Sequence, residues 1–229
     1  MKKLVCFVFA FASVMTSFAQ NAKEIVSKME ESFAARCQEG VSFNSKWSVS
    51  VVNGRTTRLV ANMSGESEPE MLKEAVGDID FLTSSISMLE DRTCEVFPDR
   101  TMYDDGNTIW KYSASNNEIG VYNKATYGSK SPCYVDFLSD IKKNYNLSIV
   151  DETDDLWVIA CKCKPVDRYL GDGRDLELTV CKDTFDPETL VIRDKDYYIT
   201  LTDFHYGVTE DQVTFHPAEY LAATFSDNR

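Results

Sequence analysis

The residues that could carry acid–base or nucleophilic chemistry are few in this 229-residue chain. Its two histidines are His205 and His216, and neither belongs to an H-E-x-x-H zinc motif. No G-x-S-x-G segment, which would present a nucleophilic serine, is present. His205 stands between Phe204 and Tyr206 in a strand-like run, as structural or exposed histidines often do. Histidine-based catalysis is therefore not predicted.

Paired carboxylates are more numerous, but their setting favours turns. The Asp pairs at 104–105 and 154–155 lie in turn-like segments, where Asp hydrogen-bonds to the nearby backbone. Three aspartates of the 167–175 segment could hold Ca²⁺, but they lack the spacing of an EF-hand loop, and a solvated loop is favoured. We predict a protein that is not an enzyme, with no catalytic residue, no metal site and no cofactor.

Six cysteines follow the first twenty residues: Cys37, Cys94, Cys133, Cys161, Cys163 and Cys181. An even number allows disulfides in an oxidising compartment, with 15 different complete pairings. Cys161 and Cys163 stand two apart in a strand-like run and so share one face, where neighbours rarely bridge each other. The alternative is that several of them are small core residues. The C-x-x-C spacing of a zinc site is absent.

The N-terminus has the pattern of a secretory signal peptide. Lys2 and Lys3 precede an apolar run of about 12 residues, which is too short to span a bilayer. Ser17-Phe18-Ala19 offers a small-x-small cleavage site, so we predict removal of residues 1–19. Residues 20–229 are then expected to form a single domain in the periplasm, without stable membrane insertion.

The net charge narrows the class of partner. The whole chain carries −13 at pH 7, and loss of Lys2 and Lys3 makes this −15. Such a surface repels phosphate backbones and anionic head groups, so nucleic acid is excluded as a partner and docking to a membrane surface is disfavoured. The charge keeps a protein with an apolar ligand soluble, and we expect a monomer.

Periodicity places a helix first and then strands. Apolar residues of 22–37 recur at helical spacing, with Lys and Glu opposite them. In 41–51 apolar and polar residues alternate, as in a strand with one apolar face. Asn53-Gly54 then predicts a tight hairpin turn, with a return strand through Leu59 and Met63.

The rest of the chain reads as strands in hairpin order, interrupted by two helices. A short acidic helix is expected within 64–81 and a second amphipathic helix at 134–145. Strand-like runs elsewhere, the last at 211–216, bring the total to about eleven. We predict a mainly β (α+β) fold, in which an incompletely closed antiparallel half-barrel has its concave face covered by two or three helices.

Such a fold encloses an apolar hollow, and the aromatic residues belong there. From the first predicted hairpin, Phe43, Trp47, Val49, Leu59 and Met63 are expected to face it. Trp110 and Tyr112 join them from the 103–123 hairpin, because residues two apart on a strand share a face. Ordinary core packing is the alternative for these two rings. A lid over the hollow is predicted from the 134–145 helix, through Tyr134, Phe137, Leu138 and Ile141.

Two segments carry a resemblance to a known family. The 103–123 hairpin supplies Asp105, Gly106, Trp110, Tyr112 and Glu118, with Ile119 at the Val position, and the last 17 residues supply Phe215, Pro217, Asp227 and Arg229. These look like the D-G-x-x-x-W-x-Y…E-V hairpin and the closing strand with its D-L-R tail in the LolA-like periplasmic lipoprotein carriers, particularly those of Bacteroidetes-type bacteria. The resemblance covers most of residues 20–229. It departs at 64–81, where Pro69 has no matching Arg beside it, so the lid-locking mechanism of better-known members does not carry over.

The resemblance implies a half-barrel chaperone that binds the acyl chains of lipoproteins and moves them from the inner toward the outer membrane. It also implies an inner-membrane lipoprotein-releasing ABC transporter as the donor. The alternative function is an exported scaffold or sensor domain of the same fold that binds lipid or protein and shuttles nothing.

Overall fold

The structure is a computed structural model, and it describes residues 21–64, 69–72, 77–127, 138–164 and 174–229. These residues fall into two compact units, each built from two stretches of the chain. Unit 1 lies within residues 1–34 and 133–194, and unit 2 within 35–132 and 195–229. The single domain predicted for 20–229 stays a prediction, and the predicted signal peptide lies outside the described residues. In the described part of the chain, no helix has the length and apolar character needed to cross a membrane.

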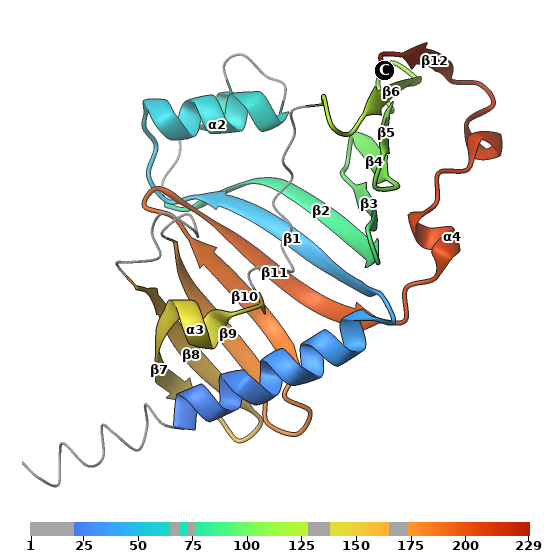
Figure 1. The fold of residues 1–229 in the computed structure, drawn as a ribbon. Coiled ribbons are helices and arrows are strands. Elements are labelled where there is room, and N and C mark those ends of the chain that lie inside the picture. Colours follow the sequence, from blue (N-terminus) through green and yellow to red (C-terminus); the bar gives the residue numbers. More distant parts are fainter. Residues whose placement is uncertain (1–20, 65–68, 73–76, 128–137, 165–173) are drawn as a thin grey trace, which may run out of the picture. The chain divides into compact units, whose positions relative to one another are not determined.

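Unit 2 contains an open sheet of eight strands (Figure 1). Along the sheet their order is β12-β6-β5-β4-β3-β2-β1-β11. All neighbouring strands run antiparallel except β12, which runs parallel to β6. The strands are β1 (Val41–Val49), β2 (Ile79–Leu89), β3 (Arg92–Val96), β4 (Arg100–Asp104), β5 (Thr108–Ser113), β6 (Glu118–Asn123), β11 (Tyr197–Tyr206) and β12 (Thr224–Asp227).

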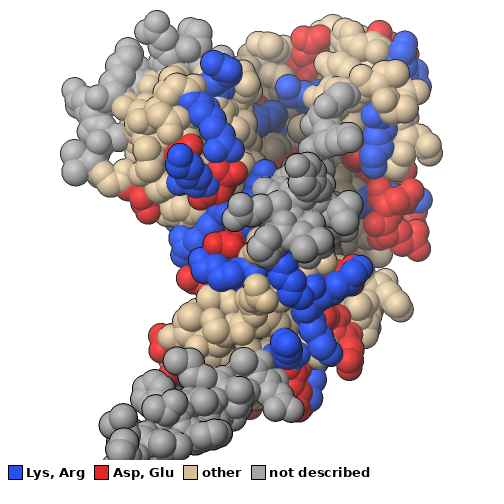
Figure 2. Space-filling view, turned by 60° about the vertical axis from the view of Figure 1, so that its left-hand side comes forward, with Lys and Arg blue, Asp and Glu red and all other residues tan. Residues whose placement is uncertain are grey.

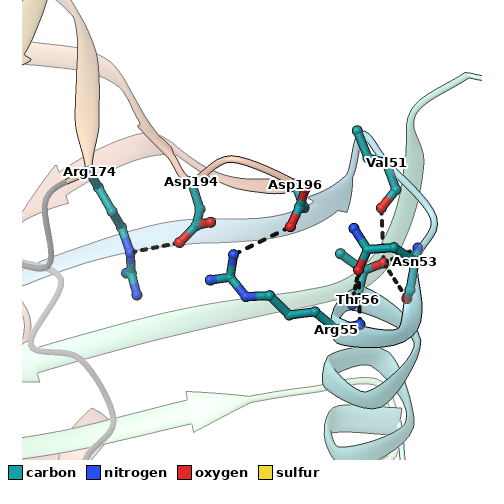
Figure 3. A network of polar contacts seen from close by, with 7 residues as sticks. All are labelled: Val51, Asn53, Arg55, Thr56, Arg174, Asp194 and Asp196. Atoms are coloured by element: carbon teal, nitrogen blue, oxygen red, sulfur yellow. Dashed lines mark hydrogen bonds and ion pairs between the residues drawn. The ribbon is translucent and has the colours of Figure 1, made fainter.

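Where the sequence predicts a return strand after β1, the structure has a helix, α2 (Gly54–Ser64). Asn53 caps it: its Oδ1 accepts hydrogen bonds from the backbone N–H groups of Arg55 at 2.9 Å and Thr56 at 3.1 Å (Figure 3). Gly54 does not adopt the positive φ that a type I′ hairpin turn requires. The hairpin prediction is therefore wrong, because Asn is as good a helix N-cap as a turn residue.

Two further segments of unit 2 differ from expectation. The acidic helix predicted within 64–81 is a single 3₁₀ turn, η1 (Glu70–Leu72), among the described residues, and β2 already begins at Ile79. The strand predicted at 211–216 is instead α4 (Glu210–Val213), followed by η4 (Pro217–Tyr220). Thr209 and Gln212 form a capping box at the start of α4, a T-x-x-Q signal that the sequence does contain.

Unit 1 contains four antiparallel strands in the order β10-β9-β8-β7. They are β7 (Tyr145–Glu152), β8 (Leu156–Cys163), β9 (Asp175–Cys181) and β10 (Pro187–Arg193), preceded by the one-turn helix α3 (Ile141–Asn144). The predicted N-terminal helix is confirmed over residues 21–37, most of which belong to this unit. Its predicted apolar stripe is at most 3% exposed: Ala22, Ile25, Val26, Met29 and Phe33.

The N-terminal helix contacts the turn between β9 and β10 and the start of α3. Lys28 lies over the ring of Phe185, with 5.1 Å from Nζ to the ring centroid, and the hydroxyl of Ser32 donates to Asp186. Glu30 accepts a hydrogen bond from the backbone N–H of Lys142 at 3.2 Å.

The strands of the two units confirm the predicted mainly β fold with open antiparallel sheets. The described residues contain twelve strands rather than about eleven.

Candidate ligand-binding site

Strand pairing in unit 2 decides which side chains share a face of its sheet. Trp47 of β1 stands opposite Leu82 of β2 and Ile199 of β11, and Phe43 stands opposite Ile86. Directly opposed residues point to the same side, and residues two apart on a strand do so too. We call this side the apolar face; on β1, β2 and β11 it carries Val41, Phe43, Trp47, Val49, Leu82, Ile86, Ile199 and Leu201.

Three of the predicted wall residues therefore lie together. Phe43, Trp47 and Val49 are 3%, 8% and 0% exposed. The indole of Trp47 stacks on the ring of Tyr197 with centroids 5.8 Å apart and meets Phe81 edge-on at 6.3 Å. A ligand can reach side chains buried to this extent only after a covering element moves.

Helix α2 carries the other two residues of the predicted hairpin, Leu59 and Met63. They follow Arg55 at intervals of four residues and so share its stripe of the helix. The guanidinium of Arg55 lies over the ring of Tyr197, 5.6 Å from the centroid, and binds the carboxylate of Asp196 at 3.4 Å (Figure 3). Because Tyr197 stands opposite Val49 on the apolar face, α2 begins over that face. Leu59 and Met63 are half-buried on a covering helix, not on a strand of the wall.

A row of polar side chains crosses the apolar face between its aromatic residues. The hydroxyls of Ser45 on β1 and Ser84 on β2 are 2.8 Å apart, and the Ser84 hydroxyl donates to Oε1 of Glu95 on β3 at 2.8 Å. Ser45 is 2% exposed and Ser84 is 6% exposed, whereas Glu95 is half-buried. Burial raises the pKa of Glu95 above its ordinary value. We call these three residues the polar row; no pattern in the sequence indicated it.

Trp110 and Tyr112 lie on the opposite face of the same sheet. Pairing runs from Ser87 through Cys94, Tyr103 and Trp110 to Val121, and Ser87 stands beside Ser42 of β1, not beside its apolar neighbours. The two rings do share a face with each other, as predicted. They do not share one with Phe43 and Trp47, so the expected common wall is not formed within unit 2.

The C-terminal segment covers these two rings. Phe215 stacks on Trp110 with centroids 5.3 Å apart, and Tyr220 packs against Tyr112 at 4.8 Å and against Phe215 at 5.4 Å. Tyr103 completes the cluster through an edge contact with Phe215 at 5.6 Å. The two segments that resemble the carrier family thus contact each other, an arrangement that the sequence analysis did not predict.

Behind β1, β2 and β11 the opposite face is polar and hollowed. A hollow of about 580 Å³ is lined there by polar residues, including Asn44, Lys46, Thr83, Ser85, Thr200 and Asp203, together with the apolar residues Val96, Phe97 and Pro98. Three of the polar side chains form hydrogen bonds with one another. The amide of Asn44 donates to the carboxylate of Asp203 at 2.9 Å and accepts from the hydroxyl of Ser85 at 2.7 Å. On β1, β2 and β11 themselves, this side of the sheet is polar, whereas the other side carries the apolar face.

Two of the four predicted lid residues are described, and both belong to unit 1. Leu138 and Ile141 are 2% and 0% exposed and form part of that unit's core, while Tyr134 and Phe137 lie outside the described residues. Their role as a lid stays a prediction. The helix predicted at 134–145 is confined to Ile141–Asn144 among the described residues.

Possible metal ligands form no cluster in the described part of the chain, since no three His, Cys, Asp or Glu side chains there gather as metal ligands would. The five described cysteines form no disulfide with one another, and burial raises the pKa of Cys94 to about 11 and that of Cys161 to about 12, which keeps both thiols protonated. In Figure 2, Lys and Arg side chains are interspersed with Asp and Glu on the face drawn.

No protein-family model matches the chain, and no curated protein matches it either. Similar solved structures include an uncharacterised conserved protein of Thermus thermophilus, with 12% identity, 91% of this chain and 99% of that chain covered, and a TM-score of 0.44. LprF of Mycobacterium bovis has 11% identity, coverages of 83% and 94%, and a TM-score of 0.45. A LolA superfamily protein of Nitrosomonas europaea has 10% identity, coverages of 86% and 98%, and a TM-score of 0.35. Likenesses at this level assign neither a family nor a function to the chain.

Proposed function

We propose that the protein binds the acyl chains of lipoproteins on the apolar face of unit 2 and carries them through the periplasm toward the outer membrane, without enzymatic activity. The observation that carries this proposal is the pairing of that face with α2. Phe43, Trp47 and Val49 form an apolar surface on β1, and the short helix α2, with Thr56 and Val60 as its buried residues, begins over it.

The free energies favour an exchange between α2 and a ligand. Each acyl CH₂ removed from water gains about 0.8 kcal/mol, so one long chain gains on the order of 10 kcal/mol. Among the residues of α2, only Thr56 and Val60 are fully buried. Burying a side chain such as Val contributes about 1.5–3 kcal/mol. An acyl chain can therefore displace α2 from the apolar face, and α2 can close again after release.

Leu59 and Met63 suit the moving element better than the fixed wall. Both are half-buried on one stripe of α2, beside the buried stripe of Thr56 and Val60. When α2 swings away, these two side chains can line the edge of the opened site. Met is flexible and polarisable, which favours contact with chains of different shape.

The carrier role includes partners and a location that follow from the resemblance. The proposed cargo is the acylated end of lipoproteins, and the proposed donor is an inner-membrane ABC transporter that releases them. Cleavage near residue 19 would place the protein in the periplasm, where it would act as a monomer.

The alternative is a scaffold or sensor that holds one lipid or protein and transfers nothing. The burial of the apolar face favours this alternative, because a buried face releases its ligand slowly. A transfer measurement separates the two functions. Donor vesicles with a quenched fluorescent lipopeptide are mixed with acceptor vesicles, and the protein is added at substoichiometric amounts. A carrier accelerates transfer over many turnovers, whereas a scaffold takes up one equivalent and stops.

Two matched variants test whether the ligand binds on the apolar face. Leu82→Glu introduces a charge on it, and Thr83→Glu introduces the same charge on the next residue of β2, which is exposed on the polar face. We expect the first to abolish binding of a fluorescent fatty acid and the second to leave it unchanged, with circular dichroism confirming that both fold. Equal binding by both folded variants would remove this face from the proposed function.

A further inference from the structure

The polar row lies on the apolar face, although binding an acyl chain there would require no polar side chains. Its three residues cross β1, β2 and β3 on the apolar face, with Phe43 and Ile86 on one side and Trp47 and Leu82 on the other. Buried hydroxyls and a carboxyl on such a face cost free energy unless they are hydrogen-bonded. The row therefore calls for an explanation beyond packing.

The hydrogen bonds of the row run in one direction. An ionised Glu95 can only accept, so the Ser84 hydroxyl gives its single proton to Oε1. Ser84 then has only lone pairs left for Ser45, which must donate its own proton. The capacity left open consists of lone pairs on Ser45 Oγ and on the Glu95 carboxylate. The row is thus built to receive hydrogen-bond donors.

The charge of Glu95 is also incompletely compensated. Within the described residues, no Lys or Arg forms an ion pair with it. Arg100 lowers its pKa only as a minor influence, and the guanidinium of Arg100 binds Asp99 at 3.0 Å and stacks on Phe97 at 4.0 Å. A half-buried carboxylate in this position favours a ligand that brings a positive charge.

We infer that the polar row is a head-group site that takes an amphiphile whose head carries ammonium N–H donors, with its apolar chain on the flanking aromatic residues. This inference rests on the proposed function, since it assigns the head of the ligand whose chain the apolar face binds. Glu95 accepts from the ammonium at the solvent-facing end of the row, and Ser45 offers a second acceptor deeper in the face. The chain then follows Phe43 or Trp47, which flank the row.

The test compares two probes of equal chain length and equal charge. Dodecylammonium carries N–H donors, and dodecyltrimethylammonium carries none. The affinity of each probe is measured by its displacement of a bound fluorescent fatty acid from the full-length mature protein. The measurement is made at about pH 7, where both probes are cationic. A hydrogen bond to a charged acceptor should make dodecylammonium bind about tenfold more tightly.

Three variants locate the effect. In Glu95→Gln the preference for dodecylammonium should fall at least about threefold, and in Ser45→Ala it should fall by less, since the carboxylate remains. Glu219→Gln, which removes a similar charge from an exposed position on η4, should keep the wild-type preference. Circular dichroism confirms the fold of each.

The possible outcomes distinguish failure of the head-group inference from failure of the proposed function. If the fatty acid binds but both probes compete equally, or if Glu95→Gln keeps the preference, the head-group site is wrong and the proposed acyl binding stands. If neither the fatty acid nor either probe binds, both are wrong.

Discussion

Phe215 lies almost parallel to Trp110, with the two rings inclined by 13° and their centroids 5.3 Å apart. The pair joins β5 to the C-terminal segment, which returns to the sheet much later in the chain. Because Phe215 also contacts Tyr103, Tyr220 and Phe225, it is the centre of the aromatic cluster on that face. Phe215 is therefore the ring with the most aromatic contacts in the C-terminal segment, which the pairing of β12 with β6 also holds to the sheet.

Replacing that ring should loosen the segment. We expect Phe215→Ala to lower the free energy of unfolding by about 2 kcal/mol, less than for a fully buried Phe because the side chain is half-buried. Urea unfolding followed by circular dichroism measures the change. Phe225→Ala, at a site 50% exposed on the edge of the cluster, is the control and should cost less than half as much. Equal losses would show that the cluster has no centre at Phe215.

The cap of α2 offers a second test. Asn53→Ala removes the Oδ1 that accepts from two backbone N–H groups and should destabilise the helix by about 1 kcal/mol. Since α2 is proposed as the cover of the apolar face, amide hydrogens of 54–64 should exchange faster, and a fatty acid should bind at a higher rate. Asn62→Ala, at an exposed position on the same helix, is the control. Faster exchange of α2 without a change in the binding rate would contradict its role as a cover.

The raised pKa of Glu95 leads us to expect that the stability of the protein depends on pH. Burial raises its pKa above the ordinary value of 4.5, so the folded state binds the proton more tightly than the unfolded state does. The resulting stabilisation is present below the unfolded pKa and is lost as the pH rises through the folded pKa. Glu95→Gln cannot ionise, so its urea midpoint relative to the wild type should rise as the pH increases above the ordinary pKa of 4.5. A constant difference between the two proteins would mean that the carboxyl is not desolvated.

Local signals predicted much of this fold. The N-terminal helix follows from five apolar residues at helical spacing, and the hairpin expected within 103–123 is formed by β5 and β6, with the Asp105-Gly106 turn leading into β5. Gly106 has a φ of +92°, and Asp104 and Asp105 both accept backbone hydrogen bonds in that turn. Such elements are fixed by residues within a few positions of one another, which is the range over which a sequence can be read directly.

The candidate site depends on relations that periodicity does not contain. Alternation along a strand shows which residues share a face, but the face itself is set by the register with neighbouring strands. Here irregularities in the pairing of β1 with β2 and with β11 intervene, and the apolar side changes between β2 and β3. The Asn53-Gly54 pair was ambiguous in another way, since it suits both a hairpin turn and a helix start. The polar row joins three strands and has no local signature.

Two single-tryptophan proteins can show which aromatic residues meet the ligand. With Trp110 and Trp157 replaced by Phe, Trp47 alone reports on the apolar face. With Trp47 and Trp157 replaced by Phe, Trp110 alone reports on the opposite face. A fatty acid brominated along its chain should quench Trp47 strongly, because bromine must lie close to the indole to act. Trp110 should keep its emission, since Phe215 covers it from the C-terminal segment.

The same pair of proteins distinguishes the remaining arrangements. Binding is confirmed for each by displacement of a fluorescent fatty acid, so that an absence of quenching is meaningful. Quenching of Trp110 with Trp47 unaffected would place the ligand under the C-terminal segment and reject the apolar face as the site. If both were quenched, the ligand would have to displace the C-terminal segment as well as α2, and Phe215→Ala should then bind more tightly. Quenching of Trp47 alone is the result expected from the opposite orientation of these two residues on one sheet.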